Sequence, residues 1–114
     1  MLIRYDSPQA QSGIRLFTTT RPGGISVGNY TSLNVSPFCG DSPEHIKHNL
    51  QLLAGEINIP SKKILIPYQT HGTEIRKIDA EFMQSDSKKQ AELLHGIDAL
   101  VTDIPGTCIG VTTA

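Results

Sequence analysis

Tryptophan is absent from this chain of 114 residues, and the other aromatic side chains are few, with three tyrosines and three phenylalanines. The core must therefore be mainly aliphatic, and a hydrophobic share of 38% allows a modest one. Cysteine is also scarce, because Cys39 and Cys108 are the only two. In an intracellular chain such a distant pair is typical of free thiols rather than a disulfide. A chain of this length is expected to form one domain or part of a larger one.

The chain has no excess of charge of either sign, since ten basic side chains face eleven acidic ones. Such a balance offers no positive surface to a phosphate backbone, and we expect no nucleic-acid partner. Long apolar runs are missing too: no segment approaches the roughly 20 apolar residues of a membrane span, and the first residues lack the apolar region of a signal peptide. We therefore expect a cytoplasmic protein without a membrane partner.

One helix has clear sequence signals at both ends. It is predicted to begin at Asp41 or Ser42, to carry Pro43 in its first turn and to end at Gly55 in the left-handed conformation. Its apolar residues recur at helical spacing along one face, namely Ile46, Leu50, Leu53 and Ala54. A second, short and mostly exposed helix is predicted over residues 85–95.

Alternation and β-branched residues predict strands elsewhere. The segments are 13–20, 31–38, 63–71, 97–104 and 107–114, with 73–82 as a hairpin partner of 63–71. Together these elements predict an α/β (α+β) fold with a mixed sheet and flanking helices. Because residues 107–114 are apolar and strand-like up to the last position, we expect residues 1–114 to be the amino-terminal portion of one larger domain.

The stretch ILIPYQTHGTEI, residues 64–75, raises the first functional question. An apolar run ends in Gln69, Thr70, His71 and Gly72. Imidazole is the commonest metal ligand and a general base, and the glycine beside His71 leaves room for a ligand. A catalytic zinc site needs three protein ligands, however, and no others are nearby in sequence. Spacing alone therefore favours a histidine that is hydrogen-bonded at a strand end, with Gln69 on the same strand face.

Three further side chains are candidates for binding. Arg21 precedes a Pro-Gly-Gly turn, where a guanidinium and outward-facing amides could hold an anion such as phosphate. A plain tight turn with a surface arginine explains the same residues. Asn34 and Gln69 carry both a donor and an acceptor, which suits them to contact a base or ribose, or equally to bridge loop backbone.

The remaining histidines and the cysteines carry weaker signals. His45 and His48 lie three residues apart but off the apolar stripe of the helix, which is typical of a solvated face, and His95 is assigned no chemistry. Cys39 stands before a predicted helix start and is the better candidate for a reactive thiol, whereas Cys108 lies in an apolar strand. No Walker, dinucleotide-binding or Gly-x-Ser-x-Gly motif is present.

Four motifs in series resemble one protein family. They are FTTTRPGGISVGNYTSLNVS (17–36), GDSPEHIKHNLQLL (40–53), IPYQTHGTEI (66–75) and GIDALVTDIPGTCIGVTTA (96–114). Their order and spacing resemble the laccase-domain family, also called multicopper polyphenol oxidase-like proteins and now regarded as purine nucleoside phosphorylases. The likeness extends from Phe17 to Ala114.

The resemblance implies an α/β enzyme that binds one metal, usually zinc, through two histidines and a cysteine. Its substrates would be purine nucleosides and phosphate: adenosine, inosine or guanosine would give the base and ribose 1-phosphate. Adenosine deamination and cleavage of methylthioadenosine are side activities of the family. His71 matches the first metal histidine. The cysteine belongs to an Ala-Asp-Cys motif that would begin at Ala114, and the second histidine lies further on, so residues 1–114 alone are expected to be inactive.

By this resemblance His71 would be the metal ligand at the catalytic centre. Arg21 would contact the anion, and Asn34 and Gln69 would contact the nucleoside or their own loops. The helix departs from the family pattern, because His-Asn-Leu at 48–50 stands where Asn-Arg is often seen. Two alternatives are a non-catalytic interaction domain on the same scaffold and a copper-dependent polyphenol oxidase, as the older name suggests. A homo-oligomer is compatible with each of these.

Overall fold

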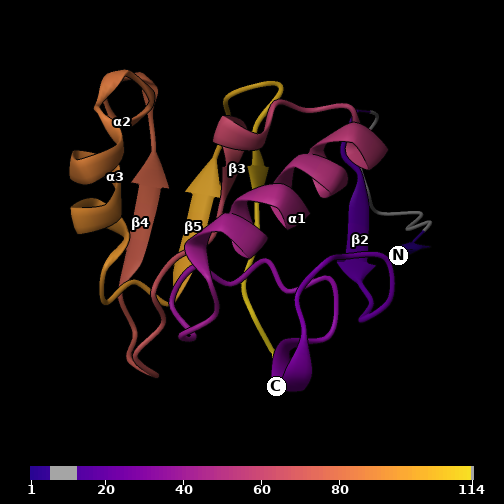
Figure 1. Cartoon of the computed structure of the whole chain (residues 1–114). Helices are drawn as coiled ribbons and strands as arrows, with labels where there is room; N and C mark the ends of the chain where they lie inside the picture. The colour runs from indigo at the N-terminus through magenta and orange to yellow at the C-terminus, as the bar shows by residue number, and fades with distance from the viewer. Residues whose placement is uncertain (6–12, 114) are drawn as a thin grey trace.

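The chain folds into short strands and three α-helices in a computed structural model that describes residues 1–5 and 13–113 (Figure 1). The strands are β1 (Leu2–Tyr5), β2 (Leu16–Thr19), β3 (Ile64–Leu65), β4 (Ile75–Ile78), β5 (Ala99–Thr102) and β6 (Cys108–Ile109). The helices are α1 (Pro43–Ile57), α2 (Ala80–Gln84) and α3 (Ser87–Leu94), with short 3-10 helices at η1 (Gly28–Tyr30) and η2 (Ser61–Lys63). The predicted α/β class with mixed strand directions and flanking helices is confirmed.

The strands pair two by two. β1 and β2 are antiparallel, whereas β3 pairs with β6 and β4 pairs with β5 in parallel. In the parallel pairs Ile64 lies opposite Cys108 and Ile75 lies opposite Ala99. The predicted hairpin between 63–71 and 73–82 is therefore wrong: each of these segments pairs with a strand that is distant in sequence and runs in the same direction.

The β3–β6 pair separates two hydrophobic clusters. Successive side chains of a strand point to opposite faces, so Ile64 and Leu65 enter different clusters. One cluster lies under α1 and contains Leu53, Ile57, Ile64 and the partly buried Cys108. The other lies under α2 and α3 and contains Leu65, Ile78, Phe82, Leu94 and the partly buried Ile109. A pair of two-residue strands thus carries both cores.

Helix α1 forms as its sequence predicts, with one difference at its end. Pro43 occupies the first turn, and Ile46, Leu53 and Ile57 are buried along one face. Gly55 lies inside the helix, so the predicted stop at that residue is wrong. The helix ends instead at Asn58, which adopts the left-handed conformation with φ of 59° and donates its backbone N–H to the carbonyl of Ala54.

The predicted strands are shortened, and one is absent. Residues 31–38 form turns and irregular backbone, because their polar groups bind atoms of the same loop and of Asn49 in α1 rather than a strand. The long strand predicted at 63–71 is reduced to Ile64–Leu65, and the one at 107–114 to Cys108–Ile109. In 73–82 a four-residue strand is followed by α2, whose first turn is capped by the carboxylate of Asp79. The helix predicted at 85–95 is confirmed as α3.

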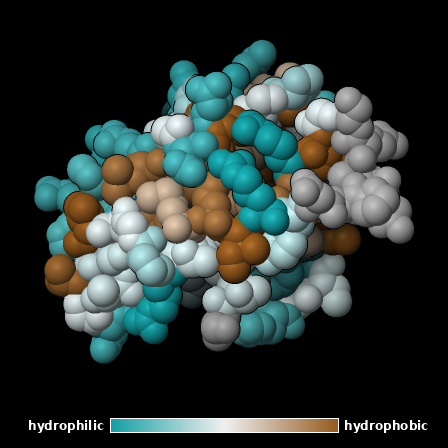
Figure 2. All heavy atoms as spheres, turned by 90° about the vertical axis from the view of Figure 1, so that its right-hand side faces the viewer, coloured by the Kyte–Doolittle hydropathy of each residue, from teal (hydrophilic) through white to brown (hydrophobic). Residues whose placement is uncertain are grey.

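Apolar side chains also lie at the surface on the side of β1 and β2, which faces the viewer in Figure 2. Ile3, Tyr5 and Leu16 of these strands each remain about half exposed. Across residues 1–5 and 13–113, no helix combines the length and apolarity needed to cross a membrane.

Candidate functional site

The Gln-Thr-His-Gly stretch is a turn gathered around one carboxylate. The backbone amides of Thr70 and His71 donate hydrogen bonds to Oδ1 of Asp98, at 3.0 and 2.8 Å, and the amide of Gly72 donates to Oδ2 at 2.8 Å. Three successive N–H groups therefore converge on the two oxygens of a single side chain. Hydrogen bonds to an ionised acceptor are stronger than neutral ones, which makes this an effective clamp on an irregular segment.

The strand pairing explains why a residue 27 positions away reaches this turn. The turn comes just before β4, and Asp98 comes just before β5, the parallel partner of β4. The register continues below the two strands, because the amide of Asp98 donates to the carbonyl of Glu74 at 3.0 Å. In Figure 1 the turn lies directly below the β4 and β5 arrows.

Gln69 ties the same turn to the chain that follows β6. Its Oε1 accepts hydrogen bonds from the amide and the hydroxyl of Thr112, at 2.8 and 3.1 Å, and its Nε2 donates to the Thr112 carbonyl at 3.3 Å. Beyond the ends of β3 and β6, the Gln69 side chain thus makes hydrogen bonds to backbone like those of a paired strand. These bonds match the loop-bridging alternative for Gln69, while its contact with a nucleoside stays a prediction.

His71 itself adopts a left-handed backbone conformation with φ of 60°, and its side chain is exposed. Such a conformation costs a non-glycine residue roughly 1–2 kcal/mol, which the Asp98 clamp offsets. The predicted placement of His71 and Gln69 on one face of a strand is wrong, because β3 ends at Leu65 and both residues lie in irregular backbone. In the part of the chain that the structure describes, no group of three His, Cys, Asp or Glu side chains could hold a metal. The described residues therefore supply one candidate ligand, not a complete site.

Arg21 lines an open hollow in the loop that follows β2. The hollow has a volume of about 450 Å³, and its lining residues are Arg21, Pro22, Gly23, Thr31 and Ser32. Nε of Arg21 donates to the carbonyl of Thr31 at 3.2 Å. A guanidinium has five N–H donors, so this contact leaves donors available for an anion. Both readings of the sequence, a structural turn and an anion contact, fit this geometry.

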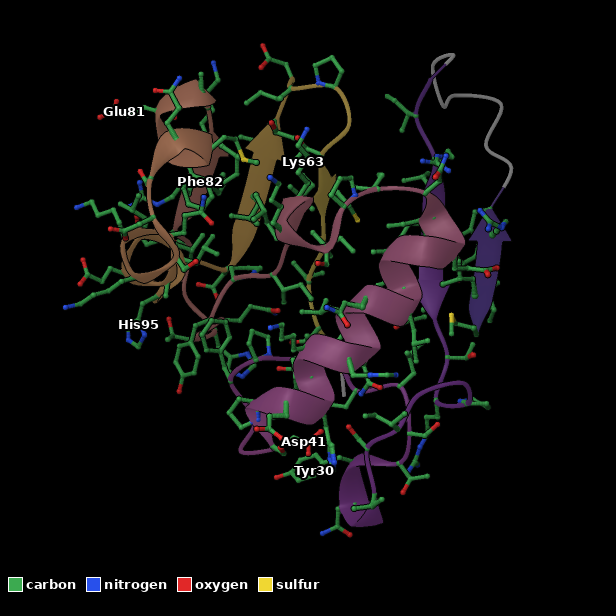
Figure 3. The ribbon with its side chains drawn as sticks, turned by 45° about the horizontal axis from the view of Figure 1, so that its top comes forward. Tyr30, Asp41, Lys63, Glu81, Phe82 and His95 are labelled. Atoms are coloured by element: carbon green, nitrogen blue, oxygen red, sulfur yellow. The ribbon has the colours of Figure 1, made fainter. Side chains whose placement is uncertain are left out.

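Asn34 is bound within its own loop. Its Nδ2 donates to Oδ2 of Asp41 and to Sγ of Cys39, both at 3.1 Å, and its Oδ1 accepts from the amide of Ser36 at 3.2 Å. Asp41 also accepts from the hydroxyl of Ser26 at 2.5 Å. The Ser26 bond, more than any other contact, lowers the pKa of the Asp41 carboxyl, against an opposing effect of burial, and Asn34 lowers it further. Figure 3 shows Asp41 at the beginning of α1.

Asn49 is a residue whose role the sequence analysis missed. It is fully buried in α1, where its Oδ1 accepts from the amide of Ile25 at 2.8 Å. Its Nδ2 donates to the carbonyls of Ser32 and Asn34 and to the hydroxyl of Ser26. One amide thereby holds the loops that carry Arg21 and Asn34 against the helix. The signal was available: Asn49 lies on the apolar stripe, three residues after Ile46.

Asp98 was missed for a different reason. An aspartate after Ile97 and before a β-branched run is an ordinary strand start, and nothing near it in sequence points to the His71 turn. The link depends on the parallel pairing of β4 and β5, which sequence reasoning replaced with a hairpin.

The other titratable candidates behave as surface or core groups. His48 is exposed on α1, and the half-buried His45 has its Nδ1 3.8 Å from Oδ1 of Asp41. His95 stacks on the ring of Tyr68 with a centroid distance of 4.7 Å. Both cysteines are free thiols, as predicted, and Cys39 is exposed. Burial raises the pKa of the Cys108 thiol, which fits the prediction that this cysteine is unreactive.

Comparison with known proteins places the chain in a family. The model of the family described as "Multi-copper polyphenol oxidoreductase laccase" matches residues 15–114. The chain belongs to this family, as its motifs predicted.

Two curated relatives carry enzyme names. A "Purine nucleoside phosphorylase" of Bacteroides thetaiotaomicron is 39% identical over 113 residues, which cover 99% of this chain and 42% of the relative. An "Adenosine deaminase RL5" of an unknown prokaryotic organism is 31% identical over 113 residues, with 99% of this chain and 43% of the relative covered. The chain thus spans about two fifths of the length of the curated relatives it matches.

A solved structure shares the fold. The crystal structure of YlmD from Geobacillus stearothermophilus superposes with a TM-score of 0.78 at 28% identity, and the match covers 90% of this chain and 38% of that one. The arrangement of helices and strand pairs in this chain is therefore that of a known fold.

Proposed function

We propose that the protein to which this chain belongs is a metal-dependent purine nucleoside phosphorylase. It would convert adenosine, inosine or guanosine and phosphate into the free base and ribose 1-phosphate. The support from relatives is the name of the Bacteroides protein, which is 39% identical to this chain. The support from the structure is the presentation of His71, whose exposed imidazole stands on a clamped left-handed turn. That presentation is the single observation that carries the proposal.

His71 is proposed as one ligand of a zinc ion. Zinc takes imidazole nitrogens readily, and a catalytic site keeps one of its four positions open. Because the described residues offer no second and third ligand around His71, the other ligands would come from the rest of the protein. When bound, the metal would supply Lewis acidity at the reacting centre.

Arg21 is the proposed contact for phosphate. Its guanidinium lines an open hollow of about 450 Å³, and its geometry suits a tetrahedral anion. For Asn34 and Gln69 the hydrogen bonds described above favour a supporting role, in which each amide holds the shape of a loop near the substrate. Direct contact with the nucleoside would require each amide to exchange one of those bonds.

Adenosine deamination is the second candidate activity, and one observation favours it: a relative that is 31% identical is named an adenosine deaminase. Cleavage of methylthioadenosine is proposed as a further side reaction. Copper in place of zinc, with oxidation of phenols, is the alternative that the family description names. A cytoplasmic location is part of the proposal, and the free thiols of Cys39 and Cys108 support it.

The test uses the full-length protein. Purified enzyme is incubated with inosine or adenosine with and without phosphate, and base, ribose 1-phosphate and inosine from adenosine are separated by chromatography. Metal content is measured by mass spectrometry, and the metal-free protein is reloaded with zinc or copper. We expect phosphate-dependent release of base with zinc and no oxidation of phenols with either metal.

His71→Ala should reduce both bound zinc and phosphorolysis at least about 100-fold, since one of the protein ligands is lost. His48→Ala is the matched control, because this imidazole is exposed on α1. It should leave both quantities unchanged. Full activity and full zinc content in a folded His71→Ala variant would refute the proposal.

A further inference from the structure

We propose that Asp98 is a positioning residue for His71: its carboxylate fixes the backbone of the Thr70–Gly72 turn and so aims the imidazole at the metal. This inference deepens the proposed function and rests on it. Asp98 makes its contacts with backbone amides, so it acts through His71 rather than on the substrate.

The first step is the number and order of the bonds. Three consecutive amides, those of Thr70, His71 and Gly72, bind the two oxygens of Asp98 at 3.0, 2.8 and 2.8 Å. A carboxylate has two acceptor oxygens, and both are engaged. An asparagine could preserve the bonds to Oδ1 but would set an NH₂ group against the amide of Gly72. Full occupancy of this clamp therefore requires the acid.

The second step is the conformation that the clamp holds. His71 has φ of 60°, a region that side chains other than glycine rarely adopt. Histidine is more frequent in this region than most residues, but without the three bonds the extended or right-handed helical region would still be favoured. A histidine that relaxed to an extended or helical backbone would point its ring in another direction, and a metal ligand loses affinity when its direction changes.

The third step is the rigidity of the support. Asp98 immediately precedes β5, and its own amide binds Glu74 just before β4. The two strands lead into the buried cluster through Ile78, which is fully buried. Gly72 lies close enough that a Cβ at this position would be 3.1 Å from Oδ2 of Asp98. The carboxylate is thus held by a sheet rather than by a flexible loop.

Other aspartates provide a chemical comparison. Asp86 accepts a hydrogen bond from the amide of Lys89 at 2.8 Å and caps α3. It performs the same backbone capping as Asp98, but it caps a helix rather than the turn that contains His71. A residue that merely stabilises the fold should behave like Asp86, whereas a positioning residue should also change the metal site.

The experiment compares Asp98→Asn, Asp86→Asn and His71→Ala with the wild type in the full-length protein. Zinc affinity is measured by competition with a chromophoric chelator, and the visible spectrum of the cobalt-substituted protein reports on ligand geometry. Thermal midpoints are recorded for each variant. We expect Asp98→Asn to weaken zinc binding 10- to 100-fold, the usual effect of losing a group that orients a ligand, and to alter the cobalt spectrum. Asp86→Asn should change zinc affinity less than twofold.

The outcomes separate the two proposals. If His71→Ala lowers zinc affinity but Asp98→Asn binds zinc like the wild type, the positioning role is overturned and the metal site stands. If His71→Ala binds zinc like the wild type, both are overturned. If the Asp98→Asn variant does not fold, hydrogen exchange in the wild type still tests the clamp. The amides of Thr70, His71 and Gly72 should exchange at least about tenfold more slowly than unprotected amides. Unprotected exchange at all three would overturn the clamp itself.

Discussion

Two irregular segments of this molecule, residues 21–34 and the Thr70–Gly72 turn, are each held by one polar side chain. The two side chains differ in charge and in burial. Asn49 is neutral and fully buried, and it binds the loops of residues 21–34 from within the helix. Asp98 is charged and only half-buried, and it binds the Thr70–Gly72 turn at the surface. If a buried side-chain amide is removed, the backbone groups that it bound are left without hydrogen-bond partners. Backbone groups at the surface can bind water instead. We infer that Asn49 serves mainly stability and Asp98 mainly direction.

Asn49→Ala should have the largest effect on stability. The amide of Ile25 and the carbonyl of Asn34 would lose the hydrogen bonds that the buried Asn49 side chain makes with them, which should cost about 4 kcal/mol of unfolding free energy. Asp98→Asn in the same full-length protein should cost about 1 kcal/mol, because water can replace the lost bond. Urea denaturation measures both. Equal losses in the two variants would contradict the contrast between a buried and a surface hub.

A matched pair of glycines sharpens the same comparison. A Cβ at Gly24 would lie 2.2 Å from the carbonyl oxygen of Ser32 and 2.6 Å from Oδ1 of Asn49, so backbone would have to move. At Gly72 the nearest atom is a carboxylate oxygen at 3.1 Å, a contact that an adjustment of a few tenths of an ångström relieves. We expect Gly24→Ala to cost about 3 kcal/mol and Gly72→Ala less than about 1 kcal/mol. Thermal unfolding of the two variants checks the order, and a Gly72→Ala variant that is the less stable of the two would contradict it.

The smallest effect concerns the pH dependence of the stability that Asp41 contributes beside the loops held by Asn49. Because the pKa of Asp41 is lowered in the folded chain, its ionised form favours folding. That contribution is complete above the unfolded value of about 4 and is lost as the pH falls through the lowered pKa. Asp41→Asn should therefore be less stable than the wild type at pH 7, and the difference should shrink by pH 3. Asp103→Asn, at an exposed position, is the control. A difference that stays constant with pH would contradict the role of the charge.

How much of this could be predicted depends on how far apart the interacting residues lie in sequence. The helix at Pro43–Ile57 was predictable because its apolar spacing and first-turn proline are local signals, and only its end was misplaced, from Asn58 to Gly55. The strands at Ile75–Ile78 and Ala99–Thr102 were found, yet their partners were not. Parallel pairing joins segments through a long connection, which local alternation cannot report.

The candidate site divides in the same way. His71, Gln69, Arg21 and Asn34 were identified from residue type and from motifs in series. The partners that give them their geometry were not, because Asp98 and Thr112 reach the turn only through parallel pairing, and Asn49 reaches Ile25 across 24 residues. Sequence reasoning proposed the candidate side chains, and the structure shows which groups hold the segments that carry them.

The two-residue strand at Ile64–Leu65 has a consequence for how the two hydrophobic clusters are joined. The side chains of Ile64 and Leu65 pack into different hydrophobic clusters, so the two clusters meet at a strand pair that is only two residues long. Removing a methyl group from Ile64 or Leu65 would loosen the packing where the two clusters meet. We therefore expect that small changes in the interior can shift the candidate site residues while their identities stay the same.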